Sequence, residues 1–86
     1  MNLIIAHTYK HAEYFARHIQ HWKLSEYRIV MTSENLRGLN SGESKTIYVV
    51  NAPRHYPTCK EMENRIKMRD VLMVFHNVTI IEVNLP

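Results

Sequence analysis

Cysteine and glycine are scarce in this chain of 86 residues, which holds one cysteine and two glycines. The lone Cys59 excludes an intrachain disulfide and a cysteine-rich zinc cluster, and it favours a reducing compartment. No stretch approaches the ~20 apolar residues of a membrane span, and the chain begins without the basic start or long apolar run of a signal peptide. We therefore expect a soluble, cytoplasmic protein with no membrane association, built as one domain over 1–86.

Strong charge of one sign is also missing. The formal net charge is +3 and the isoelectric point is near 9.2, a weak electrostatic signature for a nucleic-acid-binding protein. Six histidines form a reserve of positive charge that mild acidification would add. The charge permits an anionic partner without requiring one.

Short apolar or β-branched runs predict four strands, at 3–6, 27–31, 46–50 and 78–83. A first helix is expected after the N-cap residue Thr8 and runs to about His21 or Trp22, with Ala12, Phe15, Ala16, Ile19 and Trp22 facing the core. A short helical turn is expected at 33–37, stopped by Gly38. Thr58 and Glu61 form a capping box that opens a second helix to about Phe75, with an apolar spacing at Met62, Ile66 and Met73.

The element order is β-α-β-(short helical turn)-β-α-β, which predicts an α/β fold with three layers. Right-handed crossovers leave few topologies for a four-stranded, mainly parallel sheet, and the one we expect has the strand order 2-1-3-4. The strand at 3–6 then lies beside the strand at 46–50. The strand order reverses between them, because the chain adds strands on one side of the first strand and then on the other. Ligands of open parallel sheets bind outside the carboxyl ends of strands at such a point.

Two basic and aromatic loops are predicted to meet at this rim. A helix N-terminus with cationic side chains around it is a favourable place for an anion. The candidate residues for binding an anion or a partner are His7, Thr8, Tyr9, Lys10, His11, Asn51, Arg54, His55 and Tyr56. A nucleotide-binding loop needs glycines and a Lys-Ser/Thr pair, and this chain has no glycine between the first strand and its helix. We therefore do not expect triphosphate hydrolysis; weak binding of phosphate or a nucleic-acid backbone stays open.

Four of the six histidines lie between residues 7 and 21. At helical spacing, His7, His11, Tyr14, His18 and His21 form a stripe on one flank of the first helix. Pairs of these histidines are one turn apart, but two imidazoles do not complete a metal site, so no metal is expected. The flank is instead a candidate docking surface, formed by Tyr14, Arg17, His18 and His21.

Catalysis is the remaining alternative. Cys59 follows His55 closely, and the hydroxyls of Thr8 and Tyr9 are near His7 in sequence. Nearness in sequence does not place a base within hydrogen-bond reach of a nucleophile, and no catalytic or cofactor signature is complete. We expect a protein that is not an enzyme and needs no cofactor.

The chain also resembles small proteins of tailed bacteriophages, especially those that infect actinobacteria. The shared features are Thr8-Tyr9 after the first strand, Thr32-Ser33 followed by Leu36-Arg37-Gly38-Leu39, and Val49-Val50 before Tyr56-Pro57. The resemblance implies a reduced P-loop NTPase or helicase-like core that keeps the sheet and lacks the hydrolytic loop. Such relatives would carry glycine near His7 and near Asn51, and this chain does not.

Together these features predict a small binding protein of phage type, acting in the host cytoplasm. Its loops after the first and third strands, with the first helix, would bind a host or phage protein or a second copy of the chain. The alternative is a nucleic-acid-binding or nucleotide-binding remnant of a P-loop domain that assists a larger enzyme.

Overall fold

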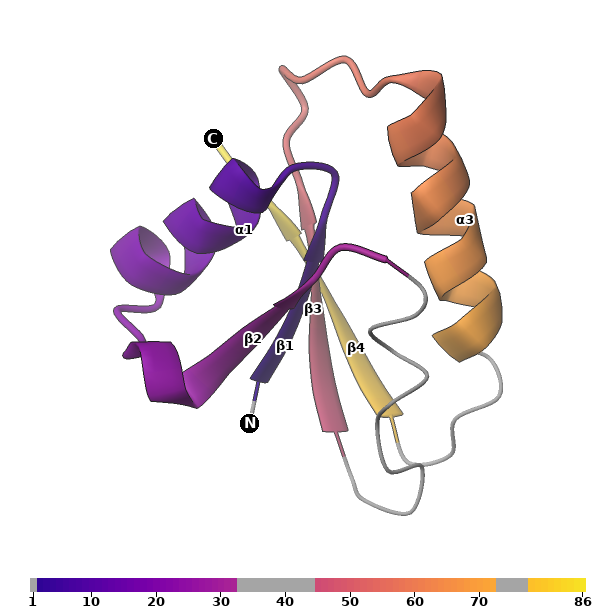
Figure 1. The fold of residues 1–86 in the computed structure, drawn as a ribbon. Helices are drawn as coiled ribbons and strands as arrows, with labels where there is room; N and C mark the ends of the chain where they lie inside the picture. Colours follow the sequence, from indigo (N-terminus) through magenta and orange to yellow (C-terminus); the bar gives the residue numbers. More distant parts are fainter. Residues whose placement is uncertain (1, 33–44, 73–77) are drawn as a thin grey trace.

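The computed structural model describes residues 2–32, 45–72 and 78–86 (Figure 1). A four-stranded sheet is built from β1 (Asn2–Ala6), β2 (Tyr27–Val30), β3 (Lys45–Asn51) and β4 (Val78–Asn84). The strand order is β2-β1-β3-β4 and every neighbouring pair is parallel, so the predicted α/β topology is confirmed. The helical turn predicted at 33–37 and its stop at Gly38 lie outside the described residues.

Strand β1 occupies the interior of the sheet because its side chains are apolar on both faces. Leu3, Ile4, Ile5 and Ala6 are all buried. Ile4 and Ala6 pack in one core cluster, while Leu3 and Ile5 pack in another, as expected from the alternation of side chains along a strand. A helical layer covers each cluster, and Figure 1 shows α1 and α3 on opposite sides of the sheet.

The first layer consists of α1 (Tyr9–Tyr14), which continues directly into a π-helical segment, η1 (Phe15–Ile19). Thr8 caps α1, as predicted, by accepting a hydrogen bond from the His11 backbone N–H at 3.2 Å. Phe15 is fully buried and its ring lies 5.7 Å from Trp22 and 5.5 Å from Tyr48, while Trp22 and Tyr48 are 5.1 Å apart. This aromatic cluster holds the layer against the sheet.

The first helix ends earlier than predicted, at Ile19 rather than at His21 or Trp22. In η1 the Gln20 N–H donates to the Phe15 carbonyl, which widens the turn, and Ile19, predicted to face the core, is 39% exposed. His21 then adopts a positive φ of 56°, and the Trp22 N–H donates to the Ala16 carbonyl at 2.8 Å. A short 3-10 turn, η2 (Leu24–Glu26), leads into β2.

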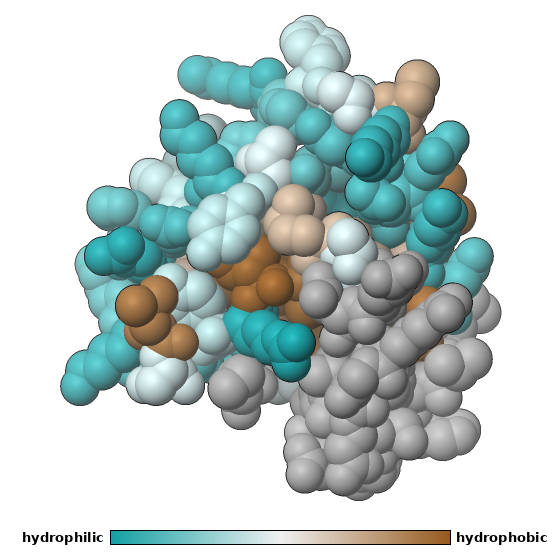
Figure 2. All heavy atoms as spheres, viewed as in Figure 1, coloured by the Kyte–Doolittle hydropathy of each residue, from teal (hydrophilic) through white to brown (hydrophobic). Residues whose placement is uncertain are grey.

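The second layer is α3 (Cys59–Leu72), capped by a hydrogen bond from the Glu61 N–H to Thr58 Oγ1 at 3.1 Å. The predicted apolar face of this helix is wrong. Met62 and Ile66 are 46% and 60% exposed, and Met68 and Leu72 are buried instead; Met73 lies outside the described residues. Hydrophobic side chains appear on the outer side of α3 among hydrophilic ones in Figure 2. The first half of α3 turns polar residues inward, so apolar spacing alone identified the wrong face.

Over residues 2–32, 45–72 and 78–86, no helix has the length and apolar character needed to cross a bilayer.

Candidate functional site

The carboxyl ends of β1 and β3 lie side by side because the two strands are parallel neighbours. His7 and Thr8 follow β1, and His55 lies on the segment after β3. The His55 ring is 6.2 Å from the His7 ring and 5.1 Å from the His11 ring, the latter in an edge-to-face arrangement. The imidazole of His55 thus joins those of His7 and His11, which are more than 40 residues earlier in the sequence, at one rim of the sheet.

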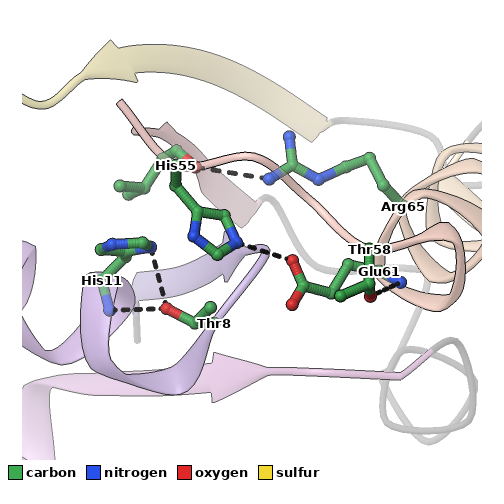
Figure 3. A network of polar contacts seen from close by, with 7 residues as sticks. Thr8, His11, His55, Thr58, Glu61 and Arg65 are labelled. Atoms are coloured by element: carbon green, nitrogen blue, oxygen red, sulfur yellow. Dashed lines mark hydrogen bonds and ion pairs between the residues drawn. The ribbon is translucent and has the colours of Figure 1, made fainter. Parts of the chain in front are cut away.

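Hydrogen bonds fix two of these rings (Figure 3). Thr8 Oγ1 lies 2.8 Å from His11 Nδ1 in addition to capping the helix. His55 Nε2 lies 2.8 Å from Glu61 Oε2 on α3. The loop after β3 is therefore tied to the first turn of α3, while His11 is tied to the end of β1.

The surroundings of His7 and His11 disfavour the protonated forms of these two rings. Burial lowers the pKa of His7, the nearby Arg65 lowers it further, and Glu61 opposes the shift. Burial also lowers the pKa of His11, with His55 and then Lys10 adding to the effect. His7 and His11 are accordingly neutral at neutral pH, and Lys10 and Arg54 are exposed cations beside them.

Glu61 is held in the charged form. Its hydrogen bond with His55 lowers the pKa of the carboxyl group, and a further contribution comes from the Thr58 backbone, the second half of the predicted capping box. One carboxylate therefore serves both the start of α3 and the orientation of His55.

A hollow of about 380 Å³, called the rim pocket below, lies between α1 and the segment after β3. Its floor is apolar and its edge is basic. It is lined by Lys10, His11, Tyr14, Ala52, Arg54, His55, Leu85 and Pro86. The Leu85 N–H donates to the Asn51 carbonyl at 2.7 Å. This hydrogen bond holds Leu85 and Pro86, which follow β4, against the pocket.

The residues predicted as an anion or partner site separate into groups. Lys10, His11, Arg54 and His55 meet in the rim pocket. Thr8 and His7 stand beside it, and Tyr56 is 92% exposed. Tyr9 lines a neighbouring hollow with Lys10, Glu13, Tyr14 and His18. Asn51 turns to the other side of the sheet, where its Oδ1 accepts a hydrogen bond from Arg65.

The predicted histidine stripe is not continuous. His7 precedes α1, and His21 lies beyond the end of η1. Between them, Tyr14 and His18 stack with their ring centres 5.2 Å apart, and Arg17 pairs with Glu13 at 3.5 Å. The docking flank is therefore short, and Tyr14 is the residue that joins it to the rim pocket.

Two residues of α3 belong to this region although the sequence did not indicate it. Glu61 was recognised as a helix cap but not as the partner of His55, and Arg65 lies close enough to His7 to lower its pKa. The available signal was the helical spacing of Glu61, Asn64 and Arg65, which puts three polar residues on one side of the helix.

Within the described segments, no group of three or more His, Cys, Asp or Glu side chains is arranged to hold a metal ion. Hydrogen bonds already engage His11 Nδ1 and His55 Nε2. The geometry is that of oriented rings beside an open basic hollow.

No protein-family model, curated protein or solved structure matches this chain. The suggested resemblance to phage proteins stays a prediction, and the chemistry of the rim is the basis for a functional hypothesis.

Proposed function

We propose that the chain is a non-enzymatic binding protein whose rim pocket holds an acidic segment of a partner protein. One observation supports this most directly: Lys10 and His11 from α1 meet Arg54 and His55 from the segment after β3 around a single apolar floor. Every basic or imidazole group of the lining comes from one of these two segments, which parallel strand pairing brings together.

The lining suits a peptide that carries both carboxylates and apolar side chains. Lys10 and Arg54 are exposed cations at the edge and can pair with carboxylates. Tyr14, Ala52 and Leu85 offer apolar area beside them. Hydrogen bonds fix the orientations of His11 and His55, and the other nitrogen of each ring can hydrogen-bond a partner.

A protein partner is favoured over nucleic acid by the number of charges. Two permanent cations line the rim pocket, and the net charge of the chain is +3. Nucleic-acid binding depends on several phosphate contacts, each of which makes affinity more dependent on salt. The phage resemblance would make the partner a host or phage protein in the host cytoplasm, and a free exposed Cys59 suits a reducing compartment.

The test is a titration of labelled protein with three probes, followed by NMR. The probes are an acidic peptide alternating glutamate with leucine, its lysine counterpart, and a single-stranded DNA. We expect the acidic peptide to shift the resonances of the rim pocket, and Lys10→Ala with Arg54→Ala to weaken binding by about five- to tenfold, since exposed ion pairs contribute little individually. The matched control is Arg28→Ala with Lys67→Ala, which removes two exposed cations elsewhere.

An equal loss in the control pair would contradict the proposal, because it would show a response to net charge alone. Tighter binding of DNA with a steep dependence on salt would replace it by the nucleic-acid alternative. A dimer in sedimentation that Lys10→Ala and Arg54→Ala disrupt would make a second copy the occupant.

A further inference from the structure

A second hollow, of about 470 Å³, lies on the other face of the sheet beneath α3. This α3 cavity has apolar walls from both layers: Ile5 and Val49 from the sheet, and Met68 and Leu72 from the helix. Ile80 on the edge strand β4 completes the wall and is 52% exposed. The volume lies in the ordinary range of small-molecule sites.

The cavity exists because α3 changes character along its length. Met68 and Leu72 fill the space next to the sheet in the second half of the helix, whereas the preceding turn puts Arg65 there. The Arg65 side chain extends toward its acceptors on Asn51 and Val50, so it does not fill the space between helix and sheet as a branched apolar side chain would. The result is an apolar hollow with a polar end.

Arg65 at that end has unsatisfied hydrogen-bonding capacity. Its Nη1 donates to Asn51 Oδ1 and its Nη2 to the Val50 carbonyl, each at 3.3 Å, and its Nε is buried without a hydrogen-bond partner. Both acceptors are neutral. Burial and then the neighbouring Arg69 lower the pKa of Arg65, and Glu82 opposes them.

We propose that the α3 cavity binds a small amphipathic carboxylate, with its apolar chain against Val49, Met68 and Ile80 and its carboxylate between Arg65 and Arg69. The two guanidinium groups of the lining outnumber its single carboxylate, Glu82. An anion there supplies the charged acceptor that Arg65 lacks, and arginine favours carboxylates geometrically. This site is separate from the rim pocket and does not depend on the function proposed for it.

Binding in the α3 cavity should change the pKa of a histidine at the rim. Arg65 is one of the groups that lower the pKa of His7. A carboxylate bound to Arg65 offsets that positive charge, so it raises the pKa of His7 from its unliganded value. An apolar molecule in the same cavity has no such effect.

The experiment uses octanoate as the probe, with octanol and octylammonium as head-group controls. Calorimetry measures affinity, and NMR of the histidine rings follows the titration of His7. We expect saturable binding of octanoate, binding of octanol weaker on the order of tenfold, and an upward shift in the pKa of His7 with octanoate alone. Equal affinity for octanol and octanoate, or no saturable binding of octanoate, would overturn the proposal.

Two matched pairs of variants locate the site. Arg69→Gln should weaken octanoate binding on the order of tenfold, while Lys67→Gln, an exposed cation of α3 outside the lining, leaves it unchanged. Ile80→Trp should block the cavity, while Ile81→Trp, on the opposite face of β4, does not. Binding that survives both Arg69→Gln and Ile80→Trp would also overturn the proposal. The pair Lys10→Ala and Arg54→Ala, which tests the rim pocket, should leave octanoate binding intact.

Discussion

On one face of the sheet, Phe15, Trp22 and Tyr48 interlock, and Ala12 and Ala16 let the helix approach β1 closely. On the other face, α3 is buried only at Met68 and Leu72, and the α3 cavity opens beside them. Each helix covers one face of the parallel sheet. They differ in how much of their length is apolar toward it.

The difference separates the two chemical regions of the molecule. Where α1 packs closely, side chains for binding remain only at its start and outer flank, and the rim pocket lies there. Where α3 packs over half its length, the uncovered half holds Glu61 and Arg65 facing inward, one reaching the rim and one the α3 cavity. Incomplete packing of a helix thus leaves room for polar groups inside the fold.

Truncating the core on each side is the strongest test of this contrast. We expect Phe15→Ala to lower the free energy of unfolding by about 3–5 kcal/mol and Met68→Ala by about 2–3 kcal/mol. Phe15 is surrounded by packed rings, whereas Met68 already borders open space. Urea denaturation followed by circular dichroism measures both values. An equal or larger loss for Met68→Ala would show that the layer of α3 is packed as closely as that of α1.

The two helix caps sharpen the comparison on a smaller scale. Thr8→Ala should cost about 1–2 kcal/mol and Thr58→Ala about 1 kcal/mol, because each removes the acceptor for a first-turn N–H. The loss at Thr8 is larger since its hydroxyl also contacts His11 Nδ1. Thermal and urea unfolding supply the values. Serine at either position keeps the hydroxyl, so a serine variant as unstable as the alanine one would rule out capping as the cause.

A substitution at the end of the first helical layer is expected to stabilise the protein. His21→Gly should raise the free energy of unfolding by about 0.5–1 kcal/mol, because glycine adopts the positive φ of this position without steric cost. His18→Gly, within η1, should instead lower it by about 1 kcal/mol. The same unfolding measurement compares the two. Destabilisation by both variants would mean that the His21 side chain contributes more than its backbone conformation costs.

Acidification should weaken the side of the rim that α1 forms. The lowered pKa values of His7 and His11 mean that the unfolded chain binds more protons than the folded one, so stability falls as pH drops below the ordinary value of 6.5. Glu61, whose pKa is also lowered, adds a loss only below its ordinary value of 4.5. Melting temperatures across this range measure the effect.

The double variant His7→Gln with His11→Gln should make the melting temperature less dependent on pH above 4.5, where Glu61 does not yet contribute. The exposed pair His18→Gln with His21→Gln serves as the control. If the control variant loses the pH dependence of the melting temperature and the His7 and His11 variant keeps it, the titrating groups lie outside the rim.

The strands and their order were readable in the sequence because each rests on a local signal. The apolar run at 3–6 and the β-branched run at 46–50 fall within β1 and β3, and the handedness of crossovers then left few strand orders, of which the expected one is observed. The meeting of His7 with His55 followed from that order. It needed no knowledge of side-chain packing.

The helix faces were harder to predict because competing effects decide them. Met62 and Ile66 have the right spacing for a core face, but Arg65 finds acceptors at Asn51 and Val50 only if α3 turns the other way. Nothing local signals the π-helical turn at Phe15, or a histidine in a left-handed conformation at His21. The roles of Glu61 and Arg65 depend on where α3 docks, which lies beyond any local pattern.

The central place of β1 has a consequence for how the molecule is made. Its residues leave the ribosome before either neighbouring strand exists, since β2 and β3 both follow it along the chain. The edge of β1 that faces β2 can pair once residue 30 has been translated, but the edge that faces β3 has no partner until translation has passed residue 51. The apolar residues of β1 are thus made before those of the other three strands, although their enclosure depends on two strands that follow later in the chain.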